Sequence, residues 1–86
     1  MNHELKIWPQ YFARVKDGTK TFEIRNNDRG FQMGDTVLLK EYVPTQVGEP
    51  GHYTGEYLAR KVGYVYRAEG NSVVFSLMPL DWRVNE

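Results

Sequence analysis

The sequence contains no cysteine and only two histidines, His3 and His52. Without thiols the protein has no disulfide framework, thiolate nucleophile or cysteine–zinc site, and two histidines alone argue against a structural metal site. We therefore expect neither a metal nor another cofactor. Any chemistry has to come from lysine, glutamate, aspartate, threonine, tyrosine or the backbone.

An excess of charge of one sign is also missing, because 11 basic side chains balance 11 acidic ones. Non-specific binding to long nucleic acid depends on cations that displace counterions from the phosphate backbone. The composition therefore does not predict tight, sequence-independent binding to DNA. A small pocket that recognises one nucleotide or one exposed base remains compatible, since stacking and base-edge hydrogen bonds need few charges.

Long apolar runs are absent as well. No stretch approaches the roughly 18 apolar residues of a membrane-spanning helix, and the opening Met1-Asn2-His3-Glu4 lacks the layout of a secretion signal. We expect a cytoplasmic protein that does not contact a membrane. The 86 residues, 41% hydrophobic and 26% charged, predict one globular domain over residues 1–86 rather than a multidomain enzyme. We expect this domain to be a monomer.

The pattern of apolar residues predicts short strands and one helix. The helix is expected at residues 9–17, because Trp8, Phe12 and Val15 form one apolar stripe and Gly18 suits the position just past a helix end. Trp8 would then lock the first strand to the helix. We expect five strands, at residues 3–7, 19–25, 36–43, 56–67 and 73–78. Short strands with turns about every ten residues favour a mainly β (α+β) fold, a small closed or nearly closed barrel with the helix plugging one end.

Several local features refine this prediction. Residues 44–55 contain two prolines and three glycines and exceed the usual length of a connection, so we interpret them as a candidate lid. Gly63 suggests a bulge in the longest strand. Phe31 and Met33 are expected in the core, and the last strand, which has little polar surface, is expected to be covered on both sides. His52 is expected to be a solvated loop residue.

Unlike charges are concentrated between Gly18 and Arg29. Alternation over residues 19–25 predicts a half-buried strand with a charged face, carrying Thr21, Glu23 and Arg25, and an apolar face with Phe22 and Ile24. A cluster of this kind can hold a polar ligand: the glutamate accepts hydrogen bonds, Arg25 offers a planar fork to a phosphate or base edge, and Lys20 acts as a point charge or proton acceptor. The alternative is a solvated face whose charges pair with each other, worth at most about 1 kcal/mol per pair.

Two residues outside this cluster are further candidates. Tyr53 is the tyrosine best placed to stack on a base, since it lies on the candidate lid, whereas tyrosines 42, 57, 64 and 66 can equally be packing residues. Arg60 is in register with Leu58 and Val62, so it either enters the barrel beside Glu23 or Glu41 or reaches solvent. Trp82 is expected to cover one end of the barrel.

The segment Gly18-Thr19-Lys20-Thr21-Phe22-Glu23-Ile24-Arg25 resembles the Gly-x-Lys-x-x-Glu-x-Arg signature of the ASCH domain superfamily, with all four specified positions matched. The resemblance extends to the opening strand, to the Phe31-x-x-Gly34-Asp35 turn and to the strands that follow. It is greatest to the small stand-alone ASCH-like proteins of phages and bacteria, which have no assigned role. It implies a PUA-like β-barrel with a cleft beside the helix for RNA or a nucleotide. We expect the ligand-binding residues to be Lys20, Glu23, Arg25, Arg29, Tyr53 and Arg60.

One branch of the superfamily consists of small amidohydrolases that deacetylate a modified cytidine with a lysine, a threonine nucleophile and a later glutamate. Lys20 matches that lysine, but Glu23 occupies the nucleophile's position, and Thr21 lies about 7 Å away along the strand. The later glutamate has no secure match, although Glu56 or Glu69 can be proposed. Three function classes stay open: an RNA- or nucleotide-binding domain, which we prefer; a hydrolase using Lys20, Thr21 and Glu23; and a protein-interaction module without chemistry.

Overall fold

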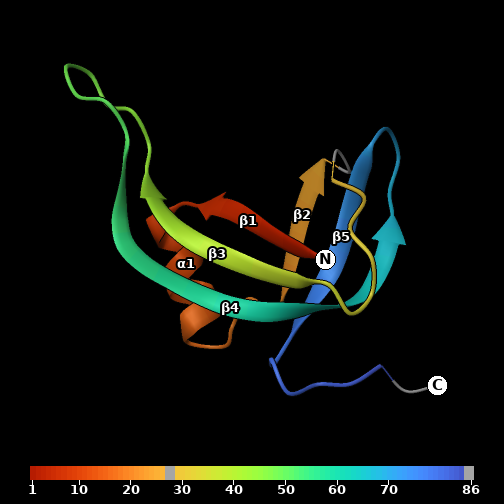
Figure 1. Ribbon diagram of the computed structural model, residues 1–86. Helices are drawn as coiled ribbons and strands as arrows, with labels where there is room; N and C mark the ends of the chain where they lie inside the picture. Colours follow the sequence, from red (N-terminus) through yellow and green to blue (C-terminus); the bar gives the residue numbers. More distant parts are fainter. Residues whose placement is uncertain (27–28, 85–86) are drawn as a thin grey trace.

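The computed structural model describes residues 1–26 and 29–84 and shows one curled β-sheet with a single short helix (Figure 1). The strands follow the order β1-β3-β4-β5-β2, with β1 parallel to β3 and every other neighbouring pair antiparallel. The predicted mainly β class is therefore confirmed, with a half-barrel as the architecture. The predicted turn at residues 26–30 falls partly outside the described residues. The elements are β1 (Asn2–Ile7), α1 (Pro9–Lys16), β2 (Phe22–Asn26), β3 (Thr36–Val43), β4 (His52–Arg67) and β5 (Ser72–Met78).

The apolar core lies on the inner side of the curled sheet. Alternation places Leu5 and Ile7 of β1 inward, and the helix adds Phe12 and Val15 from its buried stripe. Phe31 packs against Phe75 of β5 with ring centroids 4.8 Å apart. Burial of each large apolar side chain stabilises the fold by about 1.5–3 kcal/mol. The remaining buried apolar residues are Val37, Leu39, Val62 and Val73.

Helix α1 ends in a turn that leads directly into the signature segment. Gly18 has φ +87°, which favours glycine, and its N–H donates to the Val15 carbonyl at 3.2 Å. Two residues later the N–H of Lys20 donates to the Arg14 carbonyl at 2.9 Å. The predicted helix end is therefore confirmed, and it fixes the backbone from which Lys20 projects.

The two ends of the sheet, β1 and β2, form no backbone ladder with each other in the described residues. Instead, Nη2 of Arg25 donates to the Lys6 carbonyl and Nη1 of Arg29 donates to the Glu4 carbonyl, each at 2.7 Å. We call this boundary between β1 and β2 the seam. The barrel predicted from the sequence is therefore open, and arginine side chains bridge the opening where a closed barrel would have backbone hydrogen bonds.

The segment interpreted as a lid is largely a β-hairpin. β4 begins at His52, and Tyr53 pairs with Tyr42 of β3. At the tip, Gln46 and Glu49 exchange backbone hydrogen bonds of 3.0 and 2.9 Å. The hairpin extends away from β2 (Figure 1), so the prediction of a lid is wrong. Strand pairing satisfies backbone groups that a loop would leave to solvent.

Three smaller predictions have different outcomes. The register between β4 and β5 shifts between Val62 and Val65, which confirms a bulge at Gly63. Met33 is exposed rather than buried, because it occupies the turn before Gly34. The last strand is not covered on both sides: Val73 and Phe75 are buried, whereas Val74 on the alternate face is half-buried.

A buried polar pair joins the start of β1 to the turn before β3. Nε2 of His3 donates to Oδ2 of Asp35 at 2.8 Å, and both residues are buried. Asp35 also accepts hydrogen bonds from the Gln32 N–H and the Met1 amino group. Burial raises the pKa of Asp35, but these hydrogen bonds outweigh it and hold the pKa below its ordinary value. None of the helices described is long and apolar enough to cross a membrane.

Candidate ligand pocket at the seam

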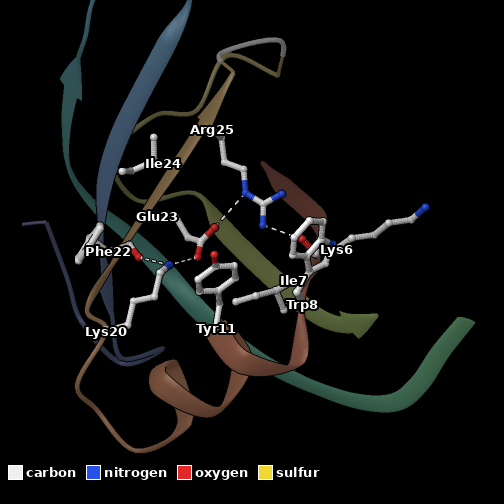
Figure 2. Close-up of a pocket in the computed structure, with 9 residues that line it drawn as sticks. All are labelled: Lys6, Ile7, Trp8, Tyr11, Lys20, Phe22, Glu23, Ile24 and Arg25. Carbon is white, nitrogen blue, oxygen red and sulfur yellow. Dashed lines mark hydrogen bonds and ion pairs between the residues drawn. The ribbon is translucent and has the colours of Figure 1, made fainter. Parts of the chain in front are cut away.

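A pocket of about 590 Å³ lies where β1, α1 and β2 meet, beside the seam (Figure 2). Its volume falls within the range of about 300–1,000 Å³ that is usual for small-molecule sites. One wall comes from the end of β1 and the first turn of α1, and the other comes from β2. We call it the seam pocket; its lining residues are Lys6, Ile7, Trp8, Tyr11, Lys20, Phe22, Glu23, Ile24 and Arg25.

Glu23 is the buried anion of the seam pocket and is only 3% exposed. Its Oε1 accepts a hydrogen bond from Nζ of Lys20, and its Oε2 accepts one from Nε of Arg25 at 2.9 Å. Figure 2 shows the carboxylate pointing between these two cations. A carboxylate is tolerated at this depth because both of its oxygens are paired with positive charge.

This arrangement corrects the predicted orientation of β2. The sequence suggested that Phe22 and Ile24 were buried and that Glu23 belonged to a solvated face. In the structure Glu23 is buried, whereas Phe22 is 42% and Ile24 60% exposed. A period of two identifies the two faces of a strand, but it does not say which one faces the interior when the charged face can be neutralised by its own neighbours.

Lys20 reaches the seam pocket from the turn after α1. Its Nζ donates to the Phe22 carbonyl at 2.7 Å as well as to Glu23, and it lies 5.1 Å from the centroid of the Phe22 ring. Within the described chain these bonds use two of the three N–H groups of the ammonium. One donor therefore remains for a ligand.

Arg25 stands between two pockets. Its Nε binds Glu23 and its Nη2 binds the Lys6 carbonyl, while Nη1 makes no hydrogen bond to the residues that the structure describes. Besides the seam pocket, Arg25 lines a second pocket of about 170 Å³ together with Arg29 and Phe31. The guanidinium is therefore both part of the seam and a donor available to an anion.

The apolar wall of the seam pocket contains an exposed aromatic stack. The rings of Trp8 and Tyr11 are nearly parallel, at 24°, with centroids 6.3 Å apart, and each residue is 47% exposed. Trp8 was expected to be a lock between strand and helix, and this prediction is wrong. Because Trp8 is the N-cap residue of α1, the buried stripe begins only at Phe12.

Sequence reasoning missed most of this wall. Tyr11, Lys6 and Ile7 were not predicted as site residues, and Phe22 and Ile24 were assigned to the core. The spacing of Trp8 and Tyr11 was a usable signal, because residues three apart in the first turn of a helix lie on one face. The signature predicted the polar floor of the pocket but carried no information on its apolar wall.

The other predicted ligand residues are placed elsewhere. Tyr53 lies in the β3–β4 hairpin, contacts Tyr42 and Lys40, and does not line the seam pocket. Arg60 is half-buried, and its Nη1 donates to the Ala59 carbonyl at 2.8 Å. Its proposed ion pair with Glu23 or Glu41 does not occur among the described residues. Arg29 lies at the seam, in the second pocket.

The residues of the hydrolase alternative are only partly brought together. Lys20 and Glu23 meet, but Thr21 is exposed and does not line the seam pocket. Glu56 and Glu69, the candidates for the later glutamate, are exposed and lie outside it too. His52 is exposed as predicted, although it begins a strand, and Trp82 near the C-terminus is half-buried.

The seam pocket has an excess of positive charge and exposed aromatic faces. Two cations, Lys20 and Arg25, accompany the carboxylate of Glu23, and Lys6 lines the pocket with its side chain directed away from that carboxylate (Figure 2). In the part of the chain that the structure describes, no group of three or more histidine, cysteine, aspartate or glutamate residues is placed to hold a metal ion. The arrangement suits a ligand that joins a flat ring to a negatively charged group.

The fold and the site define a small half-barrel domain with an aromatic and cationic pocket at its seam. The chain belongs to the family described as "Domain of unknown function (DUF3850)", whose profile matches residues 2–77 and so includes the whole seam pocket. It is also similar to an "Uncharacterized 12.9 kDa protein in GpA 3'region" of Escherichia phage P2, with 35% identity over 60 residues. These residues cover 70% of this chain and 50% of the phage protein, so the match spans about half the length of that relative.

Proposed function

We propose that this protein binds RNA or a nucleotide and that the seam pocket holds one nucleotide unit. The observation that carries the proposal is the buried carboxylate of Glu23, held between Lys20 and Arg25 at the base of a pocket with an exposed aromatic wall. Such a pocket offers three kinds of contact that a nucleotide needs: a stacking surface, a hydrogen-bond acceptor and cationic donors.

The aromatic wall provides the stacking surface. Trp8 and Tyr11 keep about half of their surface exposed although they border a pocket. Stacking of a base on such a ring contributes about 1–3 kcal/mol and accepts any base, since every base has a π-face. The wall therefore supports binding of a base without fixing which one.

The polar floor provides the other contacts. Arg25 and Lys20 each keep a donor for a phosphate or a base edge. Glu23 can accept a further hydrogen bond from an amino group or hydroxyl, because a carboxylate has about four acceptor positions. The meeting of Lys20, Glu23 and Arg25 in one pocket also supports the relationship to the ASCH domain superfamily and its PUA-like barrel that we propose.

We favour a binding protein over an enzyme. A threonine nucleophile at Thr21 would have to act from outside the seam pocket. We expect the protein to be a monomer and to act in the cytoplasm, where its proposed ligands are abundant. Light scattering tests the first expectation and cell fractionation the second.

Calorimetric titration of purified protein with the four ribonucleoside monophosphates and a mixed RNA trinucleotide tests the proposal. We expect saturable binding that Trp8→Ala weakens by about 1–3 kcal/mol through lost stacking. Tyr64→Ala is the matched control, because Tyr64 is an exposed aromatic residue outside the pocket, and it should leave binding unchanged.

Two results would contradict the proposal. Absence of binding to all of these ligands would favour the protein-interaction alternative. Equal losses in Trp8→Ala and Tyr64→Ala would place the ligand somewhere other than the seam pocket. Trp8→Ala suits the test because an exposed side chain is removed, so the fold should persist, as circular dichroism would show.

A further inference from the structure

A second cluster of cations and aromatic rings adjoins the seam pocket on β1, β3 and β4. Nζ of Lys6 lies 4.4 Å from the ring centroid of Tyr42 and 5.8 Å from that of Tyr53. Nζ of Lys40 lies 4.7 Å from the Tyr53 centroid. The two tyrosine rings meet edge to face with centroids 5.0 Å apart. We call these four residues, Lys6, Lys40, Tyr42 and Tyr53, the hairpin cluster.

Strand pairing holds the hairpin cluster together. Lys6 of β1 is paired with Lys40 of β3, and Tyr42 of β3 is paired with Tyr53 of β4. Gly51 leaves room for the Tyr42 ring, because a Cβ at that position would lie 2.3 Å from the tyrosine hydroxyl. The cluster is therefore a fixed surface of the sheet and does not depend on a mobile loop.

The charges of the hairpin cluster are available to an anion. Lys6 faces two aromatic rings and forms no ion pair with a carboxylate among the described residues. Lys40 pairs with Glu4 at 3.3 Å, but the Glu4 side chain is 69% exposed, and such pairs contribute at most about 1 kcal/mol. Tyr53 is 48% exposed, so part of its surface is open to a base.

Lys6 connects the hairpin cluster to the seam pocket, because it lines the pocket and also contacts both tyrosines. In Figure 2 its side chain extends from the pocket wall away from Glu23. A chain of cations and aromatic rings thus runs from Trp8 and Arg25, past Lys6, to Tyr53 and Lys40. Alternating stacking surfaces and cations are what a single nucleic-acid strand requires.

We propose that the hairpin cluster binds the nucleotide next to the one in the seam pocket, so that the ligand is a short single strand of RNA. The neighbouring base stacks on Tyr53, and the phosphate between the two nucleotides lies near Lys6 and Lys40. This inference rests on the function proposed above and extends it, since it makes an oligonucleotide a better ligand than a mononucleotide.

Calorimetric titration with a mononucleotide, the dinucleotide, the trinucleotide and a 12-nucleotide RNA tests this extension. We expect affinity to rise about tenfold from the mononucleotide to the dinucleotide or trinucleotide and then to stay level for the longer RNA, when it is expressed per binding register of the strand. Tyr53→Ala should abolish this rise and leave mononucleotide binding unchanged. Tyr66→Ala is the matched control, because Tyr66 is an exposed tyrosine of the same strand outside both sites.

The results separate this inference from the function on which it rests. Absence of mononucleotide and oligonucleotide binding would contradict both. Mononucleotide binding without a rise in affinity, or a rise that survives Tyr53→Ala, would overturn the hairpin cluster alone and leave the seam pocket standing. An affinity per binding register that continues to rise up to 12 nucleotides would also overturn it, since the cluster accommodates only the neighbouring nucleotide.

Discussion

Arg25 and Glu23 lie two residues apart on β2 and form an ion pair in which Nε meets Oε2 at 2.9 Å. The same guanidinium reaches across the seam to the Lys6 carbonyl. One side chain therefore neutralises the buried carboxylate and joins the two ends of the sheet. The ion pair at the base of the pocket and the bridge between β1 and β2 therefore depend on the same side chain.

Loss of the Glu23 charge should lower the stability of the fold. Glu23→Gln leaves Lys20 and Arg25, whose side chains are 20% and 26% exposed, without their anionic partner. Breaking a buried pair in this way costs about 3–5 kcal/mol; we expect about 2–4 kcal/mol here because the two cations are partly solvated. The measurement is urea denaturation, with Glu4→Gln as control because Glu4 forms a surface pair with Lys40. Equal, small losses of stability in both variants would instead support the sequence-based prediction that Glu23 lies on a solvated face.

The seam should weaken when Arg29 is shortened. Arg29→Ala removes the hydrogen bond to the Glu4 carbonyl but leaves Glu23 paired, so the effect reports on closure of the half-barrel. We expect a loss of about 1–2 kcal/mol, near the lower end for hydrogen bonds to charged groups because the side chain is exposed. Urea denaturation and amide hydrogen exchange of β1 measure the loss of stability. Arg67→Ala is the control, because Arg67 is an exposed arginine away from the seam. Unchanged stability, together with unchanged exchange of the β1 amides that pair with β3, would show that the arginine bridges do not hold the seam.

Stability should fall in acid because of Asp35. Hydrogen bonds from His3 and the Gln32 N–H lower its folded pKa below the ordinary value of 3.8, despite the opposing effect of burial. The contribution of Asp35 is therefore complete above about pH 4 and is lost as the pH falls through the lower, folded pKa. Thermal unfolding between pH 6 and pH 2 should show a steeper decline in wild type than in Asp35→Asn. Asp81→Asn, at an exposed site, is the control, and parallel curves for all three proteins would contradict the prediction.

Binding of RNA should depend only weakly on salt. Lys6, Lys20 and Arg25 can neutralise about three phosphates, which predicts a logarithmic slope of about −2 for a single strand. Titrations of a 5′-phosphorylated trinucleotide, which carries three phosphates, at two salt concentrations measure the slope, and Arg25→Ala should reduce it by about 0.7. A much steeper slope would indicate an extended basic surface that neither the seam pocket nor the hairpin cluster explains.

Deacetylation should not occur. Acetylated cytidine incubated with the protein should yield no more cytidine than with Lys20→Ala, because Thr21 does not line the seam pocket. Chromatography of the nucleosides is sufficient to measure this. Turnover by the wild-type protein that disappears in Lys20→Ala would establish an enzyme. If turnover also disappears in the separate variant Thr21→Ala, the threonine would be identified as the nucleophile.

The sequence predicted features that depend on local chemistry. The five strands and the helix follow from apolar periods of two and about three and a half, and Gly63 indicated the bulge because a glycine inside a strand is typical of one. Lys20, Glu23 and Arg25, which are close together in the sequence, also line one pocket. These features need only neighbouring residues, or residues within one strand.

The predictions that failed depend on contacts between distant segments. Alternation along β2 does not show whether Glu23 or Phe22 faces inward, because this depends on how β2 packs against the rest of the fold. Trp8 is exposed because the helix docks from its next turn onward. Closure by Arg25 and Arg29 requires knowledge of which carbonyls lie opposite, and this is a property of the assembled sheet.

The long strand β4 has a mechanical consequence. Its first part, up to Lys61, pairs with β3, its last part pairs with β5, and the bulge at Gly63 lies just past the point where one partner replaces the other. The two walls of the seam pocket are attached to these different partners, β1 to β3 and β2 to β5. β4 therefore connects the two walls of the seam pocket through the sheet. The bend of β4 at Gly63 sets the distance between β1 and β2, and with it the width of the pocket.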